Sequence, residues 1–204
     1  LCEAGTSLTR LSREAADRGL GGLEFACGIP GTVGAAIAIN AGAHGGEIGK
    51  LVEKVTVLTP EGEQITLSGE EIRFAYRRSS LLEKKVLVLG STIRLNPVKD
   101  ITAMRNTIQT YLAKRRTSQP LEYPNAGSVF RNPAGYSAAR LIEEAGWKGC
   151  RIGDAQVSEK HANFIVNRGN AKSEEIVRLI TLIREDIRSK FGIELEPEIR
   201  IIPA

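Results

Sequence analysis

The sequence predicts an α+β fold organised in two lobes. Amphipathic helical segments and alternating strand segments are mixed along the 204 residues without a regular strand–helix–strand repeat. The chain is long enough for one large or two small domains with hydrophobic cores. An Asn96-Pro97 pair closes the first group of elements, and we place the domain boundary there. We therefore expect one domain over residues 1–97 and a second over residues 98–204.

Local capping and turn signals justify the elements of the first lobe. Thr6 or Ser7 can cap the first helix, and Gly19 can end it. Apolar and polar residues alternate on both sides of Pro60-Glu61-Gly62, which is typical of a β-hairpin. In order, we expect a helix over residues 6–19, a hairpin over 51–67, a short capped helix over 68–79 and strands within 84–95.

The second lobe is predicted by the same signals. Its clearest helix has an apolar stripe of Ile176, Ile180, Ile183, Ile187 and Phe191. Ser173 can cap that helix, and Gly192 can end it. We expect Ser128 to lie in a loop. The expected elements are helices over residues 100–116, 136–146 and 172–192, and strands over 163–169 and 193–202.

The composition is that of an ordinary globular protein, with 42% hydrophobic and 25% charged residues. The net charge of +4 does not by itself indicate a nucleic-acid-binding protein. The cations form no long run, and aromatic residues make up only 5% of the chain, so no base-stacking platform is evident. A mild positive excess equally suits a pocket for a multiply anionic small molecule, and we expect no nucleic-acid partner.

The three cysteines, Cys2, Cys27 and Cys150, are an odd number without C-x-x-C spacing. This argues against a disulfide framework or a metal site and favours reduced thiols in a cytoplasmic protein. No apolar run reaches the roughly 18 residues that a membrane span needs, and no signal peptide is recognisable. The chain does not begin with Met, and we expect part of the natural N-terminus to be missing.

Two glycine clusters are candidate ligand loops. Gly28, Gly31 and Gly34 recur at every third residue, and a helix is expected to begin near Thr32. Backbone N–H groups at a helix N-terminus can bind an anion, although the spacing fits neither the Rossmann fingerprint nor the P-loop. The alternative is a tight turn with close packing. A second cluster over residues 40–46 favours the ligand interpretation.

Charged side chains and one serine are further candidates. Arg77 and Arg78 are adjacent, so one of them could bind a carboxylate while the other faces solvent. Glu198 lies in the last predicted strand, where a surface role is the simpler alternative. Ser128 would need a base to act as a nucleophile. His161 could approach it, but a structural role is more usual for such a histidine.

Five segments together resemble one known family, the UDP-N-acetylenolpyruvoylglucosamine reductases (UDP-N-acetylmuramate dehydrogenases). The match extends over essentially the whole chain and is to the shorter class, which lacks a tyrosine-bearing loop. It implies an FAD-binding region of the vanillyl-alcohol-oxidase type followed by an α+β substrate-binding lobe. The segments are "GIPGTVGAAIAINAGAHGGEI", "FAYRRSS", "QPLEYPNAGSVFRNP", "GDAQVSEKHANFIVN" and "ELEPEIRII".

The resemblance also implies roles for individual residues. Ser128 corresponds to the proton donor, Arg77 to the arginine of a Y-R-x-S motif, and Glu198 to a C-terminal catalytic glutamate. No metal is implied. The implied flavin-site residues are Gly28, Ile29, Pro30, Gly31, Thr32, Gly34, Asn40 and Gly42, and the implied substrate contacts are Arg116, Asn132 and His161.

The implied reaction uses FAD and NADPH to reduce UDP-N-acetylglucosamine enolpyruvate. The resemblance implies no obligate protein partner. A serine that protonates carbon needs no histidine base, which would explain why none accompanies Ser128. Two alternatives stay open: another flavin-dependent oxidoreductase of the same fold, and a non-catalytic fragment that binds a nucleotide sugar or RNA. The family's G-G-S-N loop is expected upstream of Leu1, so we expect this piece alone to bind FAD weakly or not at all.

Overall fold

The computed structural model describes residues 1–202, which form two compact units that divide between Arg115 and Arg116. Both units combine helices with antiparallel strands, so the predicted α+β class is confirmed. The division differs from the predicted boundary after Pro97. Its cause is helix α4 (Ile101–Ser118), because Met104 and Ile108 of this helix pack with residues of the first unit.

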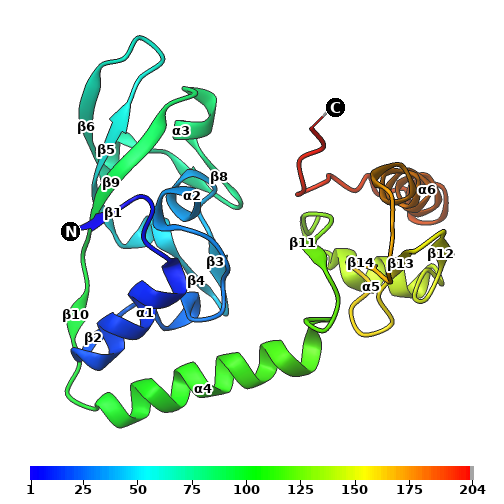
Figure 1. Cartoon of the computed structure of the whole chain (residues 1–204), viewed down its shortest axis with the longest axis horizontal. Coiled ribbons are helices and arrows are strands. Elements are labelled where there is room, and N and C mark those ends of the chain that lie inside the picture. The colour runs from blue at the N-terminus through cyan, green and yellow to red at the C-terminus, as the bar shows by residue number, and fades with distance from the viewer. Residues whose placement is uncertain (203–204) are drawn as a thin grey trace. The chain divides into compact units, whose positions relative to one another are not determined.

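A four-stranded antiparallel sheet forms the centre of the first unit (Figure 1). Its strands, in spatial order, are β1 (Cys2–Glu3), β9 (Leu87–Ile93), β5 (Val52–Leu58) and β6 (Gln64–Ser68). Val55 and Val57 of β5 are fully buried and pack with Leu8 and Ile37 of two helices. The predicted hairpin over residues 51–67 is confirmed as β5 and β6.

Helices of the first unit begin and end where the capping signals predicted. The Ser7 hydroxyl accepts a hydrogen bond at the start of α1 (Leu8–Asp17), and Gly19 has the positive φ that ends it. Thr32 caps α2 (Val33–Ala38) in the same way. The Asp100 carboxylate accepts from the Ala103 N–H at the start of α4. A further short helix, α3, spans Ser80–Glu83.

The predicted helix over residues 68–79 is wrong. One 3₁₀ turn forms at Gly69–Glu71, closed by the Glu71 carboxylate, and a hairpin comes next because Phe74 pairs with Ser79. The short strand pairs of this unit are β2 (Leu20–Gly21) with β10 (Asn96–Pro97), β3 (Gly42–Ala43) with β4 (Gly46–Glu47), and β7 (Phe74–Ala75) with β8 (Arg78–Ser79).

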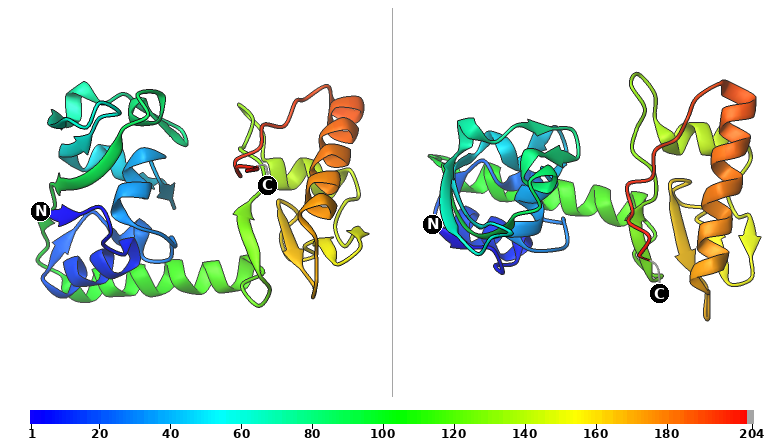
Figure 2. Two further views of the ribbon diagram at one scale, coloured as in Figure 1. Left: turned by 45° about the horizontal axis from the view of Figure 1, so that its top comes forward. Right: turned by 90° about the horizontal axis from the view of Figure 1, so that it is seen from above.

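The second unit is an antiparallel sheet that packs against two helices (Figure 2). Its strands, in spatial order, are β11 (Asn125–Ser128), β14 (Phe164–Asn167), β13 (Ala155–Val157) and β12 (Arg151–Ile152). The helices are α5 (Ala138–Glu144) and α6 (Ser173–Phe191). Ile183 and Ile187 of α6 are fully buried with Val157 and Ile165 of the sheet.

Two predictions for the second unit are wrong, and one is refined. Ser128 ends a strand and is not in a loop. The expected strand over residues 193–202 is reduced to a single bridge between Pro197 and Phe130, since proline has no N–H to extend a ladder. Ser173 is the first residue of α6 and not its cap, while Gly192 ends the helix in the left-handed conformation. No helix within residues 1–202 has the length and apolar character needed to cross a membrane.

We expect Ile183→Ala to lower the free energy of unfolding of the second unit by about 2–5 kcal/mol, because it leaves a cavity under α6. The single tryptophan, Trp147, lies in this unit and donates to Asp186 of α6, so its fluorescence during urea titration reports the change. Leu182→Ala is the matched control on the exposed face, with an expected cost below about 1 kcal/mol. Equal losses for both variants would contradict the packing described.

Candidate active site

Ser128 lies at an irregular end of the edge strand β11. It pairs with Phe164 of β14, and the register shifts between Asn125 and Ser128. Gly127 allows this shift because its φ is +85°, and its N–H donates to the Asn125 side-chain oxygen at 3.0 Å. The half-buried serine therefore comes after a backbone kink that glycine makes possible.

The structure pairs the backbone of Glu198 with Val129, the residue after Ser128. Residues 194–198, which we call the C-terminal strap, run beside the extension of β11. The Glu198 N–H donates to the carbonyl of Val129 at 2.7 Å, and the Arg131 N–H donates to the carbonyl of Glu196 at 2.9 Å. An ion pair of 2.6 Å between the Arg131 and Glu196 side chains adds to these bonds. Two predicted catalytic residues, distant in sequence, thus occupy one edge of the second unit.

Asn163 is a residue that the sequence reasoning missed. It is 4% exposed, and its side chain binds both backbone groups of Phe130: Oδ1 accepts the N–H at 2.9 Å, and Nδ2 donates to the carbonyl at 2.8 Å. Its own carbonyl accepts the Val129 N–H at 2.9 Å. Asn163 therefore fixes the two residues after Ser128. The signals in the sequence were an amide at the start of an apolar strand and its place within the segment "GDAQVSEKHANFIVN".

His161 lies near the same edge. Its ring contacts Phe164 edge-on at 4.7 Å, and Nδ1 accepts the Asn163 N–H at 3.3 Å. Burial lowers the pKa of His161 below its usual value, so the ring is neutral near pH 7 and its Nε2 carries the proton. Among the described residues the ring makes no hydrogen bond to Ser128. The histidine is thus in a position to donate to a ligand, and the structure does not pair it with the serine as a base.

The other two residues expected to contact substrate are exposed. The Asn132 side-chain oxygen accepts the Ala138 N–H at 3.0 Å, which places Asn132 at the start of α5. Arg116 lies near the end of α4, and its carbonyl accepts a hydrogen bond of 2.7 Å from the Lys160 ammonium group. Both residues belong to the second unit, together with Ser128 and Glu198.

Arg77 lies in the first unit, in the turn between β7 and β8, where its φ is +56°. Its Nη1 donates to the carbonyl of Gly42 at 2.9 Å. Arg77 is half-buried and Arg78 is exposed, in agreement with the expectation that only one of the two faces solvent. A residue expected to contact the flavin, Gly42, is therefore hydrogen-bonded to Arg77, a residue expected to act in catalysis.

The start of α2 does not offer the anion site that the glycine spacing suggested. The Val33 N–H donates to Thr6 and the Gly34 N–H to Ala4, at 2.8 and 2.9 Å, while the Ala35 N–H donates to the Thr32 hydroxyl. A Cβ at Gly34 would lie 2.7 Å from the Cβ of Ala4. Close packing, the alternative interpretation, therefore explains Gly34.

The loop before α2 is the part that fits a bound cofactor. Gly31 has a φ of +115°, and no atom lies within 4 Å of the position where its Cβ would be. Within residues 1–202 the N–H groups of Gly31 and Thr32 donate no hydrogen bond, and Pro30 next to them is exposed. An open, side-chain-free backbone with two available donors suits an anionic or carbonyl-bearing group such as FAD carries.

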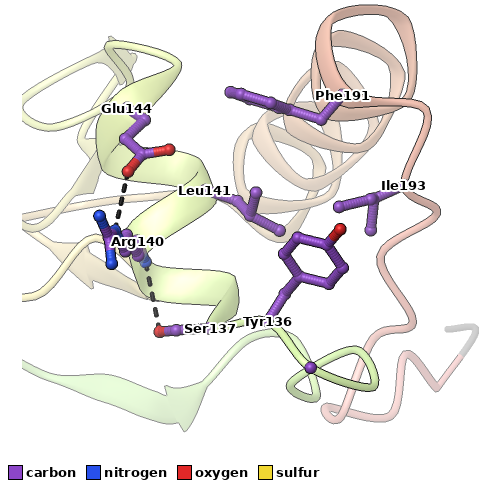
Figure 3. A pocket seen from close by; sticks show the side chains of 8 residues that line it. Tyr136, Ser137, Arg140, Leu141, Glu144, Phe191 and Ile193 are labelled. Carbon is purple, nitrogen blue, oxygen red and sulfur yellow. Dashed lines mark hydrogen bonds and ion pairs between the residues drawn. The ribbon is translucent and has the colours of Figure 1, made fainter.

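The second unit contains a groove of about 510 Å³ (Figure 3). Its lining includes the side chains of Tyr136, Leu141, Phe191 and Ile193. Arg140, which also lines it, forms an ion pair of 2.8 Å with Glu144. Its described lining contains none of the predicted site residues and offers no unpaired cation to a polyanionic ligand. We therefore do not assign the candidate active site to this groove.

Two family models match the chain. The model of the UDP-N-acetylenolpyruvoylglucosamine reductase C-terminal domain matches residues 119–202. The model of an FAD binding domain matches residues 1–68. The two matches fall in the second and the first compact unit, respectively.

Individual relatives agree with these models. The chain is 50% identical over 197 residues to UDP-N-acetylenolpyruvoylglucosamine reductase 2 of Symbiobacterium thermophilum, covering 97% of this chain and 64% of the relative. It is 50% identical over 201 residues to the reductase of Moorella thermoacetica, covering 98% and 66%. The crystal structure of UDP-N-acetylenolpyruvylglucosamine reductase from Thermus caldophilus matches with a TM-score of 0.87 and 36% identity, over 98% of this chain and 71% of that one. The chain thus spans slightly less than two thirds of the length of these curated relatives.

We expect the NMR titration midpoint of His161 to lie below 6.5, because burial disfavours its charged form. The unfolded state then binds more protons than the folded state, so the free energy of unfolding falls as the pH drops through about 6.5. His161→Gln removes the resonance and so assigns it, since His44 is the only other histidine. A midpoint at or above 6.5 would show that the ring is not buried as described.

Proposed function

Because the chain belongs to the UDP-N-acetylenolpyruvoylglucosamine reductase family, we propose that it serves the NADPH-dependent reduction of UDP-N-acetylglucosamine enolpyruvate to UDP-N-acetylmuramate. The product is a cytoplasmic precursor of peptidoglycan. The observation that carries the proposal is the backbone hydrogen bond between the strap and the residue after Ser128, because both Ser128 and Glu198 then belong to one edge of the second unit. The net charge of +4 is compatible with two polyanionic ligands.

FAD, when bound, supplies the hydride transfer between NADPH and the enolpyruvyl group. We propose that the loop over residues 28–32 is this chain's contribution to holding it. Gly31 and Thr32 provide the backbone donors, and the absence of a side chain at Gly31 permits close approach. The close packing of Gly34 against Ala4 keeps the adjoining helix α2 in place.

We propose that Ser128 donates the proton that completes the reduction. Addition of a hydride to the methylene carbon moves the double-bond electrons to the α-carbon, where they are conjugated with the carboxylate. That carbon is basic enough to take a proton from an alcohol. The O–H bond of Ser128 breaks as the new C–H bond forms, and the serine oxygen then regains a proton from solvent. The role needs no base, in keeping with the absence of a Ser128–His161 hydrogen bond among the described residues.

We propose that Arg77 and Glu198 act on the carboxylate of the substrate. The guanidinium of Arg77 can stabilise the negative charge that develops there during hydride addition. The backbone of Glu198 is hydrogen-bonded to Val129, the residue after Ser128, so its side chain starts from a defined position on the strap. The neutral His161 and the exposed amide of Asn132 are proposed to bind the remainder of the substrate.

Ser128→Ala in the full-length protein is expected to leave the reduction of bound flavin by NADPH within about twofold of the wild type. Reoxidation by the enolpyruvyl substrate should slow by about 10²–10⁴-fold, because only this half-reaction needs the proton. Stopped-flow absorbance of the flavin measures both rates.

Ser173→Ala is the matched control, since this serine is exposed at the start of α6. An equal loss in both half-reactions would reject the assigned role. If reduced flavin were reoxidised by other enols and not by this substrate, another flavin-dependent oxidoreductase would be the better assignment.

A further inference from the structure

The side chain of Asn40 is hydrogen-bonded to the hairpin that carries the proposed catalytic arginine, Arg77. Asn40 is 2% exposed, comes shortly after α2 in the chain, and has a φ of +49°. Asparagine is one of the few residues other than glycine that adopt this left-handed conformation readily. A buried amide in a turn of this kind needs partners for its polar atoms, and the partners show what the residue holds together.

Its side chain connects two hairpins. Nδ2 donates to the carbonyl of Ala75 in β7 at 2.9 Å and to the carboxylate of Glu47 in β4 at 3.1 Å. Oδ1 accepts the Gly49 N–H at 2.9 Å. Both amide protons are therefore used, one on each hairpin, and a single side chain sets the distance between β4 and β7.

The same two hairpins also meet at Arg77. This residue lies in the turn after Ala75, and its Nη1 donates to the carbonyl of Gly42 at 2.9 Å. Gly42 pairs with Glu47, the carboxylate that Asn40 binds. The contacts thus form a closed ring: Asn40 holds Ala75 and Glu47, and Arg77 and Gly42 complete the path between them.

We infer that Asn40 is a positioning residue for Arg77, and that it acts through the two hairpins without touching the cofactor. A shift of β7 relative to β4 would move the guanidinium away from the place where Gly42 holds it. The inference rests on the proposed role of Arg77 on the substrate carboxylate. It replaces the expectation that Asn40 binds the flavin.

The enclosure of Asn40 supports this assignment. A Cβ added at Gly49 would lie 2.8 Å from Oδ1 of Asn40, so the amide is closely packed where it meets the chain. A second hydrogen bond anchors β8, the other strand of the hairpin that carries Arg77: the hydroxyl of Ser79 donates to the carbonyl of Ala38 at 2.6 Å. Ser79 is also 2% exposed. Both strands of the hairpin are therefore anchored to the end of α2.

Asn40→Asp in the full-length protein tests the inference. The change keeps the size, the acceptor and the tolerance for positive φ, but it removes both donated hydrogen bonds. FAD content and reduction by NADPH should match the wild type, while reoxidation by the enolpyruvyl substrate should slow by about 10–100-fold with a raised KM. Asn106→Asp is the matched control, an amide-to-carboxylate change at an exposed position of α4. It should leave both half-reactions unchanged.

A double mutant separates positioning from direct participation. If Asn40 acts through Arg77, then Asn40→Asp combined with Arg77→Ala should be no slower than Arg77→Ala alone. Loss of FAD from Asn40→Asp, or losses that multiply in the double mutant, would overturn the inference and leave the proposed function intact. If Arg77→Ala itself did not slow reoxidation, the proposed role of Arg77 would fail, and the inference with it.

Ser79→Ala decides the question if Asn40→Asp does not fold. It removes the hydrogen bond from Ser79 to Ala38 without introducing a charge. We expect a loss of about 3–10-fold confined to reoxidation, which disappears in the Arg77→Ala background. Unchanged reoxidation in Ser79→Ala, or loss of bound FAD, would overturn the inference.

Discussion

The hydrogen bond from the Glu198 N–H to the carbonyl of Val129 is the contact on which the proposed chemistry depends. It joins the C-terminal strap to the end of the edge strand, so that the backbone of Glu198 is fixed to the residue after Ser128. Val129 is held on both sides, because its own N–H donates to Asn163. A residue fixed by two backbone hydrogen bonds gives its neighbour Ser128 a defined position, which transfer of a proton to carbon requires.

The first unit contains a similar arrangement of hydrogen bonds. A buried asparagine side chain there links two short hairpins that are too small to be stable alone. Arg77, in the turn of one hairpin, reaches the backbone of the other. In both units, then, an interior amide (Asn40 or Asn163) fixes the backbone next to a residue with a proposed chemical role.

Local signals in the sequence were sufficient for the elements that depend on local interactions. Ser7 and Gly19 delimit α1, and the isoleucine stripe of α6 is buried as its period predicts. The turn with Gly62 at positive φ joins β5 and β6. In each case the deciding contacts lie within a few residues of the signal.

Elements that depend on distant contacts were not predictable in the same way. The capping box at Ser68 stabilises only one turn, and the pairing of Phe74 with Ser79 makes the next segment a hairpin. The glycine spacing left an anion site and close packing both open for Gly34, and only its contact with Ala4, distant in sequence, decides for packing. Asn163 lies within one of the five segments of the resemblance but was given no role there, and its importance appears only when its partner Phe130 is seen. The resemblance to a family indicated Ser128 and Glu198 as candidates, but not the hydrogen bond between Glu198 and Val129.

Amide hydrogen exchange, measured by NMR at single residues, shows whether the strap is paired with the end of β11. We expect the N–H groups of Glu198 and Arg131 to exchange at least about tenfold more slowly than that of exposed Arg200, after correction for intrinsic rates. Exchange of Glu198 at the rate of an unstructured peptide would contradict this pairing. The strap would then not be paired with the strand, and Ser128 and Glu198 would not form one site.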